Sequence, residues 1–135
     1  MLNNQIPTTN NPSPDPSHPS PQPACPTPAS LSGNLFAAAT PPASGELFSV
    51  LLERPDLLIE RIVSSDQLSP TLYCQTQDEW VVLLQGEASV QLGAERVQLQ
   101  AGDYLFIPAQ TPHQVLATSA GALWLAIHHG PRGAA

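Results

Sequence analysis

Glycine-punctuated runs of alternating apolar and polar residues constrain the fold of this chain most strongly. They occupy residues 79–113, and Gly86, Gly93 and Gly102 lie at the junctions between them. Successive side chains of a β-strand point to opposite faces, so such alternation predicts half-buried strands. Glycines between short strands are typical of tight turns. The stretch therefore predicts an antiparallel β-barrel or sandwich.

The flanking sequence adds further strands. Residues 57–63 alternate and precede a break, residues 71–75 form an extended run, and residues 114–118 and 123–128 alternate again. The total is about eight short strands in sequence order.

A short helix is expected in front of these strands. Ser44 can cap its first turn, and Leu47, Val50 and Leu51 follow at helical spacing. Pro55 cannot continue a helix because it lacks a backbone N–H. We therefore predict two to three helical turns that pack on the sheet.

Proline dominates the beginning of the chain. Residues 1–42 contain 11 of the 16 prolines, no Lys or Arg, and no periodic apolar pattern. Such a segment buries too little apolar surface to offset the entropy lost on ordering. We predict a disordered tail over residues 1–42, one folded domain over residues 43–130 and a flexible C-terminus over residues 131–135.

Charge and cysteine content exclude several classes of partner. The net charge is −7, the chain has no lysine, and its four arginines form no cluster in the sequence. Binding to nucleic acid requires a basic patch, so we predict neither a nucleic-acid nor a membrane partner. The N-terminus has no secretory pattern, and Cys25 and Cys74 make no disulfide framework. A cytoplasmic protein is expected.

Two motifs within residues 79–113 resemble those of the cupin superfamily. Glu79 followed by six residues and Gly86 resembles the end of the first cupin motif. Gly102, Pro108 and His113 resemble the second motif, G-x5-P-x-G-x2-H, after a spacer of 15 residues. The resemblance covers residues 45–130, most closely small cupin-2 proteins without an assigned reaction. It implies an all-β, double-stranded β-helix, a jelly-roll-like barrel of the RmlC type, with an internal pocket.

The resemblance also implies where metal ligands would lie. Metal-binding cupins use two histidines, the first-motif glutamate and the second-motif histidine. The two first histidine positions fall here on Tyr73 and Gln75, or on Leu72 and Cys74 with one more residue in the spacing. Cys74 points opposite to Tyr73 and Gln75 on simple alternation, so only one set can face the pocket. The second-motif glycine and closing asparagine are replaced by Gln110 and Ala117.

Several residues are candidates for a functional site. Glu79 and His113 are the catalytic candidates, and with Gln75 they are the candidate ligands for a divalent metal (Fe, Mn, Zn or Ni). His113 without a metal would instead hydrogen-bond to Glu79. The candidates for ligand binding are Tyr73, Gln75, Trp80, Phe106 and His128.

Three functions remain open on the sequence. The chain could bind a small molecule in a polar pocket formed by Tyr73, Gln75, Glu79 and His113, the interpretation that the missing histidines favour. It could be a metal-dependent oxygenase, isomerase or lyase with a reduced site, or use Glu79 and His113 as a metal-free acid/base pair. It could also be a non-catalytic interaction scaffold. The strand at residues 104–107 is apolar on both faces, which favours a homodimer.

Overall fold

The structure, a computed structural model, describes residues 31–132. These residues form eight β-strands and no α-helix, and they contain no helix long and apolar enough to cross a membrane. Disorder was predicted for residues 1–42 and flexibility for residues 131–135, and of these segments residues 1–30 and 133–135 lie outside the described residues. The strands are β1 (Glu46–Arg54), β2 (Leu57–Ser64), β3 (Asp78–Gln85), β4 (Glu87–Leu92), β5 (Glu95–Gln100), β6 (Tyr104–Ile107), β7 (His113–Thr118) and β8 (Ala122–His129).

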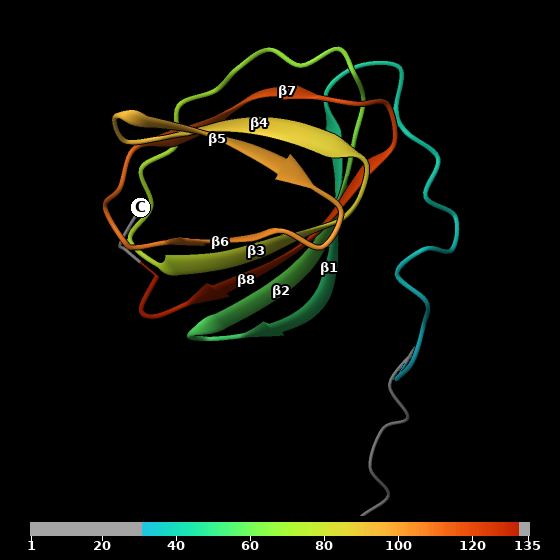
Figure 1. The fold of residues 1–135 in the computed structure, drawn as a ribbon. Coiled ribbons are helices and arrows are strands. Elements are labelled where there is room, and N and C mark those ends of the chain that lie inside the picture. Colours follow the sequence, from blue (N-terminus) through green and yellow to red (C-terminus); the bar gives the residue numbers. More distant parts are fainter. Residues whose placement is uncertain (1–30, 133–135) are drawn as a thin grey trace, which may run out of the picture. The chain divides into compact units, whose positions relative to one another are not determined.

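Two antiparallel sheets face one another (Figure 1). The first has five strands in the order β1-β2-β8-β3-β6, and the second has three in the order β5-β4-β7. Every pair of neighbouring strands is antiparallel. The all-β, jelly-roll-like fold predicted from the sequence is confirmed.

The core lies between the sheets and holds the side chains that alternate inward. Leu83 from β3 and Ala126 from β8 are fully buried, and Val90 and Leu99 meet them from the three-stranded sheet. Burying each large aliphatic side chain contributes about 1.5–3 kcal/mol. This packing sets the register that also aims the polar side chains of the site inward.

The predicted helix before Pro55 is wrong, because this segment forms β1. Its register against β2 shifts between Val50 and Leu52, so one extra residue interrupts the alternation there. The apolar residues at positions 47, 50 and 51 therefore do not follow strict alternation, and their spacing is one that an amphipathic helix also shows. Strand β1 gains its backbone hydrogen bonds from β2 along its whole length.

The predicted extended run at residues 71–75 forms a single bridge instead of a strand. Tyr73 and His113 exchange two backbone hydrogen bonds, of 2.8 and 2.9 Å. Gln110 donates its backbone N–H to the carbonyl oxygen of Gln75 at 2.6 Å. Gln110 stands where the second cupin motif has glycine, and its φ of 62° keeps the left-handed conformation that glycine favours. These contacts fix residues 73–75 beside β7.

The outward face of the five-stranded sheet is rich in apolar side chains. Trp80 pairs with Phe106 across β3 and β6, and Trp80 stacks on Tyr104 with ring centroids 5.8 Å apart. All three aromatic rings are exposed. The homodimer expected from the sequence stays a prediction, and this face is the surface it would use.

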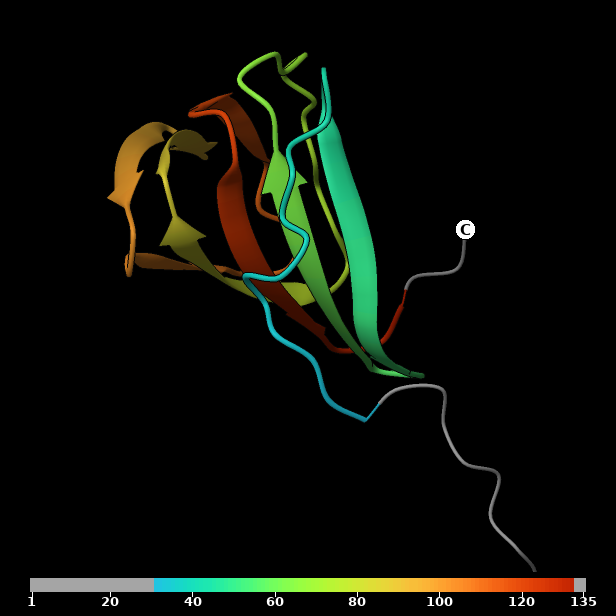
Figure 2. The ribbon, with the colours of Figure 1, turned by 90° about the vertical axis from the view of Figure 1, so that its right-hand side faces the viewer.

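Residues 32–45 run along the outside of β2 (Figure 2). Arg61 in β2 donates hydrogen bonds to the carbonyl oxygens of Leu35 and Ala37, at 3.0 and 2.6 Å. A further bond of 3.4 Å reaches the carbonyl oxygen of Ala38. The guanidinium therefore holds the turn at residues 35–38 against the sheet.

Candidate functional site

A cavity of about 160 Å³ lies between the two sheets. Most of its walls are aliphatic or aromatic, and a few carboxylates, imidazoles and an amide project into it, which is typical of a small-molecule site. The residues around it are Glu46, Phe48, Glu60, Ile62, Tyr73, Gln75, Glu79, Val81, Val90, Leu105, Ile107, His113, Val115, Trp124 and His128.

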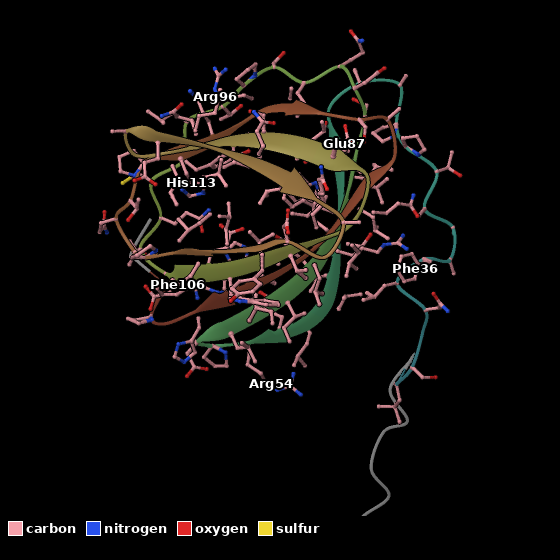
Figure 3. The ribbon with its side chains drawn as sticks, viewed as in Figure 1. Phe36, Arg54, Glu87, Arg96, Phe106 and His113 are labelled. Atoms are coloured by element: carbon pink, nitrogen blue, oxygen red, sulfur yellow. The ribbon has the colours of Figure 1, made fainter. Side chains whose placement is uncertain are left out.

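Glu79 and His113 meet inside this cavity from opposite sheets. Figure 3 labels His113, which lies between the two sheets. Glu79 begins the inward row of β3, and His113 is the first residue of β7. Glu79 Oε2 lies 3.5 Å from His113 Nε2, and both residues are buried. His113 Nδ1 donates to the carbonyl oxygen of Thr111 at 2.9 Å, so Nε2 is the nitrogen that faces the cavity. The ring of Tyr73 stacks on His113 at 5.8 Å.

The amide of Gln75 links this pair to a second histidine. Its Nε2 lies 3.3 Å from Glu79 Oε2 and 3.4 Å from His113 Nε2. Its Oε1 lies 3.0 Å from His128 Nδ1. The nitrogen of the amide is therefore directed at Glu79 and His113, and the oxygen is directed away from them.

His128 has a hydrogen-bond partner at each ring nitrogen. Since an amide oxygen only accepts, Nδ1 of His128 donates to Gln75. Nε2 lies 3.0 Å from Glu60 Oε1. When His128 is protonated, its pair with the Glu60 carboxylate carries no net charge. A buried pair that is neutral and fully hydrogen-bonded avoids the cost of an isolated charge.

Glu46 enters the cavity from the first strand. Its Oε2 accepts a hydrogen bond of 2.6 Å from the hydroxyl of Ser64, the residue opposite it on β2. The Ser64 oxygen in turn accepts a bond of 3.0 Å from the indole N–H of Trp124. Burial raises the pKa of Glu46; the Ser64 hydrogen bond acts in the opposite direction, and the charges of Glu60 and Glu79 raise this pKa further.

Both histidines of the cavity hold their protons more tightly than free imidazole. The interaction with Glu79 is the main cause that raises the pKa of His113, and it outweighs the effect of burial. For His128, burial is the largest single effect and disfavours the charged ring. The hydrogen bond to Glu60 and the charges of Glu79 and Glu60 together outweigh it, so the pKa of His128 is also raised.

The side chains around Glu79 and His113 do not fit a divalent metal ion. Iron, manganese, zinc and nickel sites in proteins are built mainly from imidazole, thiolate and carboxylate ligands. At this position only Glu79 and His113 offer such groups, because Gln75 presents the nitrogen of its amide, which has no lone pair to give. Within residues 31–132, no three His, Cys, Asp or Glu side chains converge as a metal cluster.

The structure brings together five of the seven predicted site residues. Tyr73, Gln75, Glu79, His113 and His128 all line the cavity. Cys74 is exposed, as alternation with its neighbours requires. The binding and catalytic roles of these residues stay predictions.

Trp80 and Phe106 are not brought to the cavity. Each alternates with a residue that faces inward, Glu79 in β3 and Ile107 in β6, so each points out of the sheet. Alternation along these two strands was the signal that could have shown this from the sequence.

Sequence analysis missed Glu46 and Glu60, which both line the cavity. Glu46 falls within the segment that the sequence predicts as a helix. Glu60 shares one face of an apolar strand with Leu58 and Ile62, and a charged side chain on such a face was a usable signal.

Comparisons with known proteins agree with this architecture. The family described as cupin domain matches residues 64–128. A protein of Ralstonia eutropha JMP134 provisionally named a mannose-6-phosphate isomerase is 40% identical, with a TM-score of 0.68 over 73% of this chain and 96% of that chain. No curated protein matches the sequence.

Two more distant structures share the fold. A conserved protein of unknown function from Streptococcus pyogenes is 20% identical, with a TM-score of 0.67 over 79% of this chain and 93% of that chain. An RmlC-like cupin from Shewanella frigidimarina NCIMB 400 is 17% identical, with a TM-score of 0.59 over 64% of this chain and 78% of that chain. The two motifs, the facing antiparallel sheets and these similarities together show that the chain belongs to the cupin superfamily.

Proposed function

We propose that this cupin binds a small organic molecule in the cavity between its sheets. The observation that carries the proposal is the convergence of Gln75, Glu79 and His113 on a cavity of about 160 Å³ with mainly apolar walls. Such a combination supplies both affinity and orientation for a small ligand. Because the polar side chains hold one another by hydrogen bonds, the site is organised before a ligand enters.

The ligand that we propose is not a phosphorylated sugar such as the one in the name of the relative from Ralstonia eutropha. A phosphorylated sugar carries an anionic group, which proteins bind with Arg, Lys or clusters of backbone N–H groups. None of the residues described around this cavity is Arg or Lys.

The binding function is tested with a cavity-filling variant. Ligand-observed NMR with a panel of uncharged and charged fragments of up to about ten heavy atoms should identify binders to the wild-type protein. In Val115→Phe the new ring occupies part of the cavity, so these signals should disappear. Gln114→Phe is the matched control, because residue 114 precedes residue 115 on β7 and does not line the cavity.

Two results would contradict the proposal. The panel could yield no binder to the wild-type protein, which would favour an interaction scaffold. Alternatively, Val115→Phe could bind the same fragments as the wild type, which would place their site elsewhere on the chain.

A second candidate function is metal-independent proton transfer by Glu79 and His113. It is favoured by the 3.5 Å contact between their side chains and by Thr111, whose carbonyl oxygen orients the imidazole. In this reaction the Glu79 carboxylate accepts a proton from a carbon next to a carbonyl group. His113, in its protonated form, donates its Nε2 proton to the carbonyl oxygen, which gives an enediol or enol.

Solvent-deuterium exchange tests this reaction with a small neutral carbonyl compound, dihydroxyacetone, as the probe. Wild-type protein should accelerate deuterium incorporation from D₂O at the carbon atoms next to the carbonyl, and Glu79→Gln and His113→Asn should abolish the acceleration. Equal incorporation in wild type and both variants would exclude this activity toward the probe while leaving the binding proposal intact.

A further inference from the structure

The charged side chains of the cavity restrict the kind of ligand that it accepts, given the proposed binding function. Three carboxylates, those of Glu46, Glu60 and Glu79, line it, and the described lining contains no Arg or Lys. Glu60 and the protonated form of His128 make a pair without net charge. The pair of Glu79 and His113 carries one negative charge or none, depending on the proton at Nε2.

A positive charge on the ligand is therefore favoured over a negative one. An anion would enter a partly desolvated site that holds no uncompensated positive charge, and such a transfer is strongly disfavoured. A cation would meet an excess of carboxylates. The charged side chains of the cavity thus disfavour carboxylate and phosphate ligands, and they favour ligands that are cationic or uncharged.

Glu46 distinguishes between these two remaining classes. Its side chain accepts a hydrogen bond from the hydroxyl of Ser64, and no cationic side chain among residues 31–132 forms an ion pair with it. Ser64 fixes the carboxylate across the β1–β2 pair, so its position does not depend on a ligand. A partly buried carboxylate with a fixed position and no counter-charge is suited to an ammonium group.

The position of Glu46 also indicates where that ammonium group would lie. Glu46, Phe48 and Tyr73 line both the cavity and an adjoining groove of about 310 Å³. These three residues therefore lie where the two spaces adjoin, and we call them the mouth of the cavity. Phe48 and Tyr73 remain 54% and 42% exposed, so their rings are accessible to a ligand at the mouth. The faces of aromatic rings attract cations, most strongly where water is partly excluded.

We propose that the cavity binds a small organic ammonium ion. Its charged group lies at the mouth, beside Glu46 and the rings of Phe48 and Tyr73, and its apolar part enters the interior between Val90, Val115 and Trp124. A cavity of about 150 Å³ can take up benzene. The present cavity, of about 160 Å³, is thus matched to an apolar part the size of one six-membered ring.

Three probes of nearly equal shape and different charge test this inference: cyclohexylammonium, cyclohexanol and cyclohexanecarboxylate. Isothermal titration calorimetry should show binding that is tightest for cyclohexylammonium, at least about tenfold weaker for cyclohexanol, and undetectable for cyclohexanecarboxylate. The affinity for cyclohexylammonium should fall as salt is added, because ions screen the exposed part of the interaction.

Glu46→Gln should weaken cyclohexylammonium binding about tenfold and change cyclohexanol binding less than twofold. The amide oxygen can still accept the Ser64 hydrogen bond, so this variant should keep its melting temperature near that of the wild type. Glu95→Gln, an exposed residue of β5 outside the cavity, removes the same charge and should change neither affinity. If Glu46→Gln fails to fold, Phe48→Leu provides the second test, since it removes an aromatic face from the mouth and should also weaken only the ammonium probe.

The outcomes separate this inference from the proposed function. If cyclohexanol or the carboxylate binds as tightly as the ammonium probe, or if Glu46→Gln binds all three like the wild type, the inference is overturned while small-molecule binding stands. If none of the three binds and the fragment panel also yields no binder, both are overturned.

Discussion

The imidazole of His128 fixes the orientation of the Gln75 amide, with Nδ1 of the ring 3.0 Å from Oε1. The amide nitrogen is then directed at Glu79 and His113. A donor group occupies the place where a third metal ligand would be needed. The position of His128, on a strand far from Gln75 in sequence, therefore helps to explain why Glu79 and His113 do not form a metal site.

A histidine at position 75 should create a metal site. Gln75→His would place a second imidazole next to Glu79 and His113, giving three ligands of the type that Zn²⁺ and Ni²⁺ prefer. We expect calorimetric titration with Ni²⁺ to show a stoichiometric site in this variant and only weak binding in the wild type. Cys74→His, whose side chain is on the exposed side, should bind like the wild type. Tight Ni²⁺ binding by the wild type would contradict the interpretation of the amide.

The buried pair of Glu60 and His128 should stabilise the fold only while both members are present. His128→Leu leaves the Glu60 carboxylate and the Gln75 oxygen without their partner, which should lower the free energy of unfolding by about 3 kcal/mol. The double variant with Glu60→Leu should recover most of this loss, because it removes the unpaired charge. Urea denaturation of the four proteins in the cycle measures the coupling.

The exposed pair of Glu53 and Arg132 is the control for that cycle. Its atoms are as close, at 2.8 Å, but both side chains are about half exposed. Its coupling should be below about 1 kcal/mol. If the Glu60–His128 cycle gave a coupling as small as this one, the pair would contribute little to stability.

Stability should decrease as the pH rises from about 6 to 8. In the folded chain the pKa values of His113 and His128 are raised, above all by Glu79 for His113, and for His128 by Glu60 and Glu79 against the effect of burial. The stabilisation from each protonated ring is fully present below the unfolded pKa of about 6.5 and is lost as the pH rises through the folded pKa.

Urea denaturation across this pH range, with NMR titration of the ring protons, checks the prediction. His113→Asn and His128→Asn should each flatten the dependence of the free energy of unfolding on pH, and His129→Asn, exposed at the end of β8, should not. A rise in stability over the same range would contradict the assigned direction of the shifts.

The hydroxyl of Ser64 should matter more than its size suggests. Ser64 is completely buried, donates to Glu46 and accepts from Trp124. Ser64→Ala leaves the buried indole N–H without an acceptor, so the free energy of unfolding should fall by about 2 kcal/mol. In a Trp124→Phe background, where no indole N–H is present, the cost should be smaller. Ser49→Ala, on the exposed part of β1, should change stability by less than about 0.5 kcal/mol.

Most of the fold could be predicted from local patterns, since alternation and turn glycines are properties of neighbouring residues. The strand at residues 57–63 and those between Glu79 and His128 follow this rule and are confirmed. Strand β1 does not follow it, because the bulge at Val50 to Leu52 breaks the alternation. A helix was the wrong interpretation of a pattern that a bulge can also produce.

The candidate site could be predicted only where a motif marks it. Glu79 and His113 stand at the spacing of two cupin motifs, and Tyr73 and Gln75 follow from the distance to Glu79. The contact of Glu60 with His128 joins residues 68 positions apart. It depends on the register in which β2 pairs with β8, and no local pattern encodes that register.

Strand β1 lies at the edge of its sheet and is hydrogen-bonded to β2 alone, whereas β3 and β8 each lie between two neighbours. The residues at the mouth, Glu46 and Phe48, belong to this edge strand, and Glu79 and His128 belong to the two inner strands. A substitution of Glu46 or Phe48 therefore disturbs one strand pairing, and a substitution of Glu79 or His128 disturbs two. Substitutions at the mouth, in evolution or by engineering, can accordingly change which molecules enter the cavity while Glu79 and His128 keep their positions.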